Sequence, residues 1–259
     1  MAAPVRVRDL ALEVRVHADS DAVGIAAADD AARAIADAVA NRGVANVMFA
    51  SGNSQLAFLE VLTGRSDVDW NRLVGFHMDE YVGIDGEHPA SFRRYMGERI
   101  VGAVHPSAFH EIHGDAADVG AECQRYAALL ADHPLDLCCL GIGENGHLAF
   151  NDPPVADFED PLDVKVVELD DACRRQQVGE GHFASIDAVP ATAITVTIPA
   201  LLRARTVLAI VPEARKRESV RRALTGPVEE ACPASILQTK GNVTLHLDVE
   251  SAADLELSK

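Results

Sequence analysis

Short apolar runs alternate with stretches of helical periodicity along most of the chain, and this pattern predicts an α/β fold. Apolar runs bounded by glycine, proline or polar residues are typical of buried parallel strands. Such runs predict strands at 44–50, 72–78, 135–142, 164–169, 194–198, 207–211 and 243–247, and a looser alternation predicts an edge strand at 5–16.

The intervals between these strands carry helix signals. The first predicted helix begins at Ser20 or Asp21 and ends at Gly43. Its predicted apolar stripe consists of Ile25, Ala32, Ile35 and Val39. Further helices are predicted at 55–62, from the 88–91 segment to about 100, and at 119–131, 213–224 and 233–237. Because strands alternate with helices without a repeat or linker, we expect residues 1–259 to form a single three-layer, doubly wound domain with a mostly parallel sheet.

One polar segment, 170–188, fits neither pattern. It follows an irregular stretch that contains Pro153, Pro154 and Pro161 and a short predicted strand. Loops of this length in compact domains are often functional. We therefore expect a mobile flap at 153–188.

The composition is that of a soluble globular protein, with 48% hydrophobic and 24% charged residues. No apolar run approaches the ~20 residues that a membrane span needs, and the N-terminus lacks the apolar stretch of a signal peptide. We therefore expect a cytoplasmic protein that does not associate with membranes. The net charge of −17, from 23 basic and 40 acidic residues, disfavours nucleic-acid binding. It also means that an anionic substrate must be bound by local amides and a few cations.

The cysteines and histidines do not predict a disulfide framework or a metal site. Five cysteines at irregular spacings are not a disulfide pattern. Cys138 and Cys139 are adjacent on a strand and face opposite sides, so they are interpreted as small core residues. His105, His110 and His113 lie in a proline-containing loop region without a helical i, i+4 pair, which disfavours metal binding.

The first candidate for catalysis is the loop after the predicted strand at 135–142, which presents Glu144, Asn145 and His147, followed by Asn151 and Asp152. In open α/β sheets, ligands bind outside the carboxyl ends of the strands. A histidine there, with a carboxylate five residues later, is suited to proton transfer. The alternative for an isolated Gly-His pair is a surface histidine on a tight turn.

Two further candidates concern an anion. Ser51, Gly52, Asn53 and Ser54 lie between a predicted strand and helix, where backbone N–H groups and the helix dipole attract a phosphate. One glycine is a weak motif, and a plain strand–turn–helix connection is the alternative. Lys216 falls in the first turn of its helix, where the dipole does not favour a cation, so its position indicates a bound anion. The alternative is a solvated lysine among neighbouring arginines.

With these loops, and Asp79-Glu80-Tyr81 at the end of the 72–78 strand, the chain resembles the glucosamine-6-phosphate deaminase (isomerase) family from about 44 to 248. The most specific matches are 76–83, 141–153 and 226–237. The resemblance implies a doubly wound fold related to those of ribose-5-phosphate isomerase and 6-phosphogluconolactonase. It also implies conversion of glucosamine 6-phosphate to fructose 6-phosphate and ammonia, without a metal or organic cofactor.

Matched position by position, the resemblance assigns Asp79 as the base that takes the C2 proton and returns it at C1. Glu80 would face away from the substrate on an extended chain. His147 matches the residue that opens the sugar ring, a role for which an imidazole pKa near 6.5 is suited. The segment 51–54 matches the phosphate loop, and Lys216 matches the cation on the phosphate side.

Three departures from the family pattern accompany this assignment. Asp152 stands where better-known members have a longer glutamate that orients the histidine. Asn145 stands where some members have aspartate; an amide can orient a histidine but cannot favour imidazolium by charge. The flap segment 179–183 lacks the family's phosphate-binding arginine in register, so Arg174 or Arg175 from a shifted flap, or His182, are the candidates for contact with the substrate.

Four hypotheses about the function therefore remain open. The first is a glucosamine-6-phosphate deaminase, and the second a deaminase of a related substrate such as galactosamine 6-phosphate. The third, a 6-phosphogluconolactonase, is disfavoured because such enzymes have a pattern similar to Asp-Glu-Arg where this chain has Asp-Glu-Tyr at 79–81. They also have a pattern similar to Asp-Gly-His where this chain has Asn-Gly-His at 145–147. The fourth is a non-catalytic sugar-phosphate sensor, which lacks support because no basic helix-turn-helix precedes the fold. Each implies a small sugar phosphate as partner, and the family leaves a homo-oligomer open.

Overall fold

Eight strands of the described chain form the central sheet, and every neighbouring pair except β1 and β2 runs parallel. The computed structural model describes residues 4–5, 10–179 and 181–256. Across the sheet the order is β1 (Pro4–Val5), β2 (Glu13–His17), β11 (Val243–Asp248), β10 (Thr206–Val211), β7 (Leu137–Leu140), β3 (Ala45–Phe49), β4 (Leu73–His77) and β6 (Ala108–His110). The sequence predicted the five central strands β11, β10, β7, β3 and β4 to within two residues at each end.

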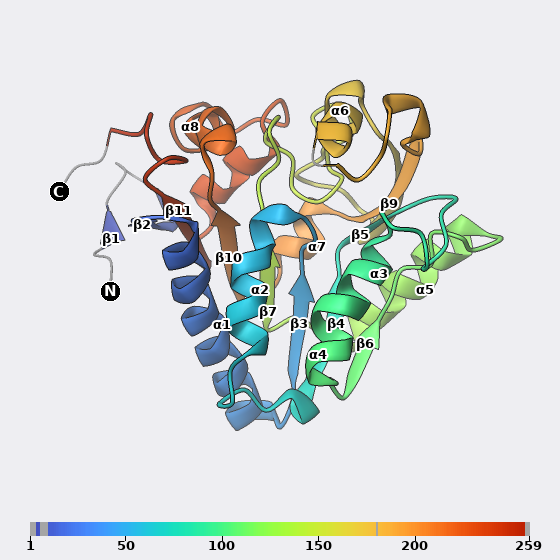
Figure 1. Ribbon diagram of the computed structural model, residues 1–259, viewed down its shortest axis with the longest axis horizontal. Helices are drawn as coiled ribbons and strands as arrows, with labels where there is room; N and C mark the ends of the chain where they lie inside the picture. The colour runs from blue at the N-terminus through green and yellow to red at the C-terminus, as the bar shows by residue number, and fades with distance from the viewer. Residues whose placement is uncertain (1–3, 6–9, 180, 257–259) are drawn as a thin grey trace.

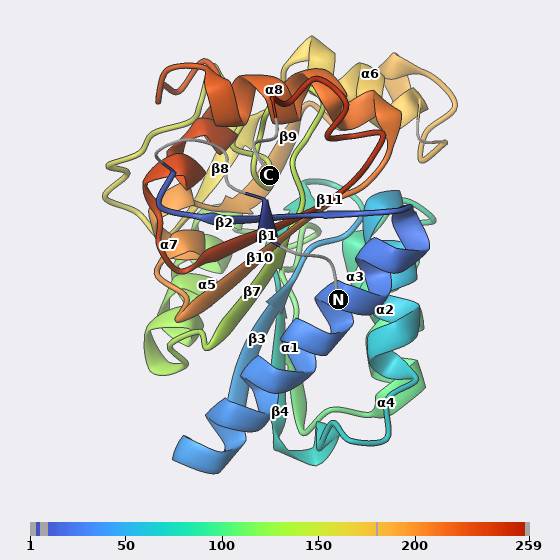
Figure 2. The same cartoon turned by 90° about the vertical axis from the view of Figure 1, so that its left-hand side faces the viewer.

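Helices cover both faces of this sheet, which gives three layers (Figures 1 and 2). One face carries α1 (Ser20–Arg42), α2 (Leu56–Thr63), α3 (Phe92–Met96), a π-helical turn (Gly97–Val101) and α4 (Gly102–Val104). The other carries α5 (Val119–Asp132) and α7 (Ile198–Leu202). Cys138 and Cys139 belong to separate hydrophobic clusters on opposite faces, which confirms their interpretation as core residues. α6 (Asp171–Gly179) and α8 (Arg217–Thr225) lie at the end toward which β3 points (Figure 1).

A second, three-stranded antiparallel sheet was not expected from the sequence. It has the order β5 (Asp79–Tyr81), β9 (Thr192–Val196) and β8 (Val164–Glu168). The strands at 164–169 and 194–198 were predicted, but their assignment to a single sheet is wrong. Hydrophobic periodicity indicates that a segment is a strand without naming its partner, and here β9 pairs with the residues directly after β4.

Several boundaries also differ. Of the predicted strand at 5–16, residues 6–9 lie outside the described residues, and β2 begins only at Glu13. Asp19, instead of Ser20 or Asp21, caps α1, because its side chain accepts a hydrogen bond from the Ala22 amide. Ile25 is 52% exposed and does not belong to the apolar stripe. The buried face is rotated because α1 packs closely on α2: a Cβ at Gly24 would lie 2.8 Å from the Ala57 backbone.

The segments after the central strands also contain elements that the sequence did not show. β6 includes His110, which was expected in a loop. The segment 153–188 contains β8, α6 and a 3-10 turn (Ile186–Ala188), and its mobility stays a prediction. The helices predicted at 213–224 and 233–237 are confirmed, with 3-10 turns at Ala214–Lys216 and Pro233–Thr239. Within the described residues, no helix combines the length and apolarity needed to cross a membrane.

β3 and β7 are neighbours, and the chain continues from them toward opposite edges of the sheet. From β3 it proceeds outward through β4 to β6, and from β7 through β10 to β11. A crevice forms at such a topological switch point, outside the carboxyl ends of the two strands. The predicted phosphate loop follows β3, and the His147 loop follows β7.

Candidate active site

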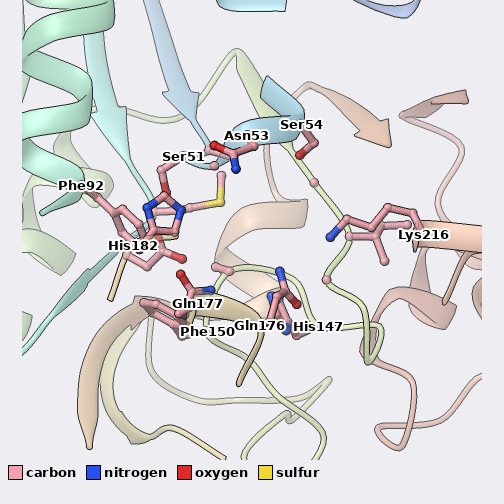
Figure 3. A pocket seen from close by; sticks show the side chains of 18 residues that line it. Ser51, Asn53, Ser54, Phe92, His147, Phe150, Gln176, Gln177, His182 and Lys216 are labelled. Atoms are coloured by element: carbon pink, nitrogen blue, oxygen red, sulfur yellow. The ribbon is translucent and has the colours of Figure 1, made fainter. Parts of the chain in front are cut away.

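A pocket opens at this switch point, with about 590 Å³ of empty space, part of which is open to solvent. Four parts of the chain line it: the segment 50–54 after β3, the loop 141–150 after β7, the β4–β5 junction, and α6 with the residues that follow it. Lys216 and Phe92 complete the lining (Figure 3). Asp79, His147, Ser51–Ser54 and Lys216, which are far apart in sequence, therefore face one space.

The segment Ser51–Ser54 forms a rigid turn at the start of a helix. Gly52 has φ of 109°, a region that disfavours residues with a Cβ, and its carbonyl accepts hydrogen bonds from Gln55 N at 3.1 Å and Tyr95 Oη at 3.0 Å. The 3-10 turn Asn53–Gln55 follows and leads into α2. Gln55 Nε2 also donates to the Ile210 carbonyl at 3.2 Å, which ties the turn to β10. Helix-start amides held in this way attract an anion.

Lys216 lines the pocket on the other side from the Ser51–Ser54 turn, and the turn and this lysine together are called the anion cradle. Its side chain lines the pocket and the residue is only 3% exposed, so the alternative of a solvated surface lysine is wrong. Figure 3 shows its ammonium group pointing into the pocket, with Asn53 and Ser54 above it in this view. The preceding Glu213 has φ of 85°, an uncommon conformation for a non-glycine residue, and its amide donates to Asp248 Oδ2 at 2.9 Å.

His147 is held through one ring nitrogen. Its Nδ1 lies 2.8 Å from Asn145 Oδ1 and 2.9 Å from Asp152 Oδ1, and Asn145 Nδ2 donates to the same Asp152 oxygen at 2.8 Å. Both alternatives for orienting the histidine therefore contact it. Because both neighbours offer acceptors, the Nδ1 position carries the proton and Nε2 is left for a ligand. Gly143 is required beside the ring, since a Cβ there would lie 2.2 Å from His147 Cε1.

The pKa values of two buried carboxyl groups in the site are shifted in opposite directions. Burial, followed by the charges of Glu80 and Asp152, raises the pKa of Asp79 well above its ordinary value. Although burial alone raises it, the adjacent His147 and hydrogen bonds from His147 and Asn145 hold the pKa of Asp152 below its ordinary value. A protein that shifts two carboxyl groups apart in this way distinguishes a proton acceptor from an orienting anion.

Glu80 faces away from the pocket, as its alternation on the strand predicts. Its carboxylate accepts hydrogen bonds from Ser91 Oγ at 2.7 Å and from the amides of Tyr81 and Arg93 at 2.9 Å each. Burial still raises the pKa of Glu80, against the effect of these hydrogen bonds. Glu80 therefore fixes the turn from β5 to α3 and does not contact the cavity.

The flap contributes Gln176, Gln177 and His182 to the pocket. His182 was a candidate, whereas sequence reasoning missed both glutamines and Phe92 and Phe150, because no local sequence signal marks them. Arg174 does not line the pocket: its guanidinium donates to the carbonyls of Ile186 at 2.7 Å and Val189 at 3.2 Å. Arg175 does not line it either. Neither arginine therefore lines the pocket in this conformation, and a contact with the substrate from a shifted flap stays a prediction.

Among the described residues, one group has metal-ligand spacing: ligand atoms of His147, Asp152 and Cys173 lie within 4.8 Å of one another. Burial and the charge of Asp152 raise the pKa of Cys173, which favours the thiol over the thiolate that binds metals. His147 and Asp152 already share a hydrogen bond. The arrangement thus fits an oriented imidazole better than a metal centre.

Comparisons with known proteins identify relatives of the chain. The family model for glucosamine-6-phosphate isomerases/6-phosphogluconolactonase matches residues 18–245. A glucosamine-6-phosphate deaminase of Streptococcus pneumoniae (strain Hungary19A-6) is 36% identical over 216 residues, which cover 83% of this chain and 88% of the relative. The corresponding deaminase of strain TIGR4 is 36% identical over 211 residues, covering 81% of this chain and 87% of that protein.

Solved structures extend the likeness to the fold. A monomeric glucosamine-6-phosphate deaminase superposes with a TM-score of 0.83 at 29% identity, covering 93% of this chain and 98% of that one. A 6-phosphogluconolactonase from Shewanella baltica gives a TM-score of 0.76 at 18% identity, covering 95% of this chain and all (100%) of the other. The second likeness shows a shared fold alone.

Proposed function

The chain belongs to the glucosamine-6-phosphate isomerase/6-phosphogluconolactonase family, and on that premise we propose that it is a glucosamine-6-phosphate deaminase. The enzyme isomerises the amino-aldose phosphate to fructose 6-phosphate and releases ammonia. The observation that carries the proposal is the single pocket shared by an oriented imidazole, a buried carboxyl group and an anion cradle. Each of these three groups has one step to perform.

The phosphate binds first, between the amides of Ser51–Ser54 and the Lys216 ammonium. Helix-start amides and a nearly buried cation supply charge-assisted hydrogen bonds without a metal ion. Because the net charge of the chain is −17, this local positive site is needed to hold a dianion. Binding at this end leaves the sugar ring between His147 and Asp79.

His147 opens the ring. The hydrogen bonds from Nδ1 to Asn145 and Asp152 fix the ring plane and leave Nε2 toward the sugar. An imidazole in this state transfers a proton between the C1 hydroxyl and the ring oxygen, which yields the open-chain aldehyde. Asp152 stabilises any imidazolium that forms, since its lowered pKa keeps it ionised.

Asp79 then moves the proton from C2 to C1. Removal of the C2 proton forms the C1–C2 double bond and an oxyanion at O1, which takes a proton from the neighbouring ammonium group. Return of the first proton to C1 leaves C2 double-bonded to nitrogen. Water adds there and ammonia leaves, which gives the ketose. The raised pKa of Asp79 suits a group that must both accept and return a proton.

The test is ammonia release measured across glucosamine 6-phosphate and galactosamine 6-phosphate, with hydrolysis of 6-phosphogluconolactone run alongside. We expect one ammonia per fructose 6-phosphate from the first substrate and the highest kcat/KM for it. If galactosamine 6-phosphate were turned over preferentially, the proposed substrate would be wrong. If lactone hydrolysis were preferred, the proposed reaction would be wrong. Tight binding of sugar phosphates without any turnover would make the protein a sensor.

A further inference from the structure

Gln177 on α6 is a flap residue whose side chain is held by a buried hydrogen bond. Its Oε1 accepts a hydrogen bond from Tyr81 Oη at 2.6 Å, and both residues are buried. The Gln177 carbonyl also accepts a hydrogen bond from His182 N at 3.1 Å, which closes the turn after the helix. Gln177 nevertheless lines the same pocket as Asp79.

The Tyr81 hydroxyl is itself held in place. Its ring packs against Phe92 at 5.0 Å, Phe150 at 5.2 Å and Phe183 at 5.2 Å between ring centroids. Tyr81 and Asp79 are two residues apart on β5, so their side chains leave the strand on the same face. The hydroxyl that positions Gln177 therefore lies on the face that carries the catalytic carboxyl group.

With Oε1 bound to Tyr81, the amide nitrogen is directed elsewhere. Within the described chain, no hydrogen bond joins Gln177 Nε2 to another residue. Figure 3 shows the Gln177 amide beside Phe150, across the pocket from Asn53 and Ser54. An amide N–H that opens into the pocket without a protein acceptor is available to donate to a ligand oxygen. Its position favours an oxygen at the sugar end of the substrate over one of the phosphate.

We propose that Gln177 donates this hydrogen bond to O1 of the open-chain substrate, and this inference rests on the proposed deaminase function. When Asp79 takes the proton from C2, the C2–H electron pair becomes the C1–C2 double bond and the carbonyl π pair moves onto O1. A fixed neutral donor beside O1 stabilises the charge that develops there. Tyr81 is the positioning residue, because it holds the Gln177 amide and does not itself donate to the substrate in this proposal.

The test compares Gln177→Glu and Gln177→Leu with the wild type in steady-state kinetics. Gln177→Glu is the sharper variant because its carboxylate still accepts from Tyr81 and lacks the N–H. We expect kcat to fall ~10²-fold in both, as for loss of one oxyanion donor, with KM changed less than about threefold. The primary isotope effect on kcat with substrate deuterated at C2 should rise, because proton abstraction becomes slower relative to the other steps.

Tyr81→Phe keeps the donor but removes its positioning, so we expect an intermediate loss of ~10-fold and a smaller rise of the isotope effect. Val178→Ala is the matched control: Val178 is the neighbour of Gln177 on α6 and packs against the same aromatic cluster, without a polar group. Its isotope effect should equal that of the wild type.

Two results would overturn the proposal. One is a Gln177→Glu enzyme with kcat within threefold of the wild type and an unchanged isotope effect. The other is a rise in KM alone, which would assign Gln177 to ground-state binding. A wild-type protein that releases no ammonia would instead refute the proposed function, so the two failures are distinguishable.

Discussion

The two sides of the pocket are built differently. The first side, called the rim here, lies at the carboxyl ends of strands of the large, mostly parallel sheet. It supplies the Ser51–Ser54 turn, the His147 loop and Lys216, all from segments that follow these strands. The small antiparallel sheet and α6 supply Asp79, Gln177 and a cluster of aromatic residues around Tyr81. The first side offers amides, an imidazole and an ammonium group, which bind and polarise. The second offers a buried carboxyl group beside aromatic side chains, to which we assign proton transfer to and from carbon.

The electrostatics follow the same division. On the rim, Asp152 is beside His147 and its pKa is lowered. On the small sheet, burial and the charges of Glu80 and Asp152 raise the pKa of Asp79. A carboxyl group with a raised folded-state pKa lowers stability once pH exceeds its unfolded value, because folding opposes its ionisation. The small-sheet side therefore gives up stability for a stronger base, whereas the rim does not.

Asp79→Asn should produce the largest effect, because it removes the only group assigned to carry the proton. We expect kcat to fall ~10²–10⁴-fold, with binding of substrate kept. At neutral pH the variant should also unfold at a higher temperature, since asparagine removes a carboxyl group whose ionisation folding opposes. Turnover by ammonia release and unfolding by calorimetry measure the two results.

Glu80→Gln is the matched control for this variant, since it neutralises the adjacent carboxyl group on the opposite face of β5. It should keep turnover within a few-fold and lose stability, because Glu80 accepts hydrogen bonds from Ser91 and three backbone amides. If Asp79→Asn kept near wild-type turnover, the assignment of the base would be wrong. If both variants lost turnover equally, the contrast between the two faces of β5 would fail.

The rim was largely predictable from the sequence, whereas on the small-sheet side Asp79 and two strands were predicted but their pairing and the residues around Asp79 were not. A glycine turn between an apolar strand and a helix, or a Gly-His pair after a strand, is a local signal, and parallel strands bring such loops to one edge. The partner of β5 and the contact of Gln177 with Tyr81 join segments about a hundred residues apart through side-chain packing. No local pattern encodes that packing, so the second sheet and both flap glutamines were missed.

His147→Gln should have the next largest effect, with a greater loss on ring-closed than on open-chain substrate. The glutamine side chain is similar in size to imidazole but cannot exchange a proton near neutral pH. We expect kcat/KM for the cyclic sugar to fall ~10²-fold, and a smaller loss when the open-chain form is supplied. The measurement is a pre-steady-state burst on the fraction of substrate already open. Equal losses on both forms would remove the ring-opening role from the rim.

Lys216→Met should have the smallest effect of the three and should act on binding. Removing one charge-assisted hydrogen bond to phosphate costs ~1.5–3 kcal/mol, so KM should rise ~10–100-fold while kcat changes little. Arg221→Met is the control, because Arg221 makes the same charge change on α8 while its guanidinium pairs with Glu218 at 2.6 Å outside the pocket. A loss in kcat with KM unchanged would mean that the phosphate cation also positions the sugar for proton transfer. The two sides of the pocket would then act as one unit, and substrate binding could no longer be assigned to the rim and proton transfer to the small-sheet side.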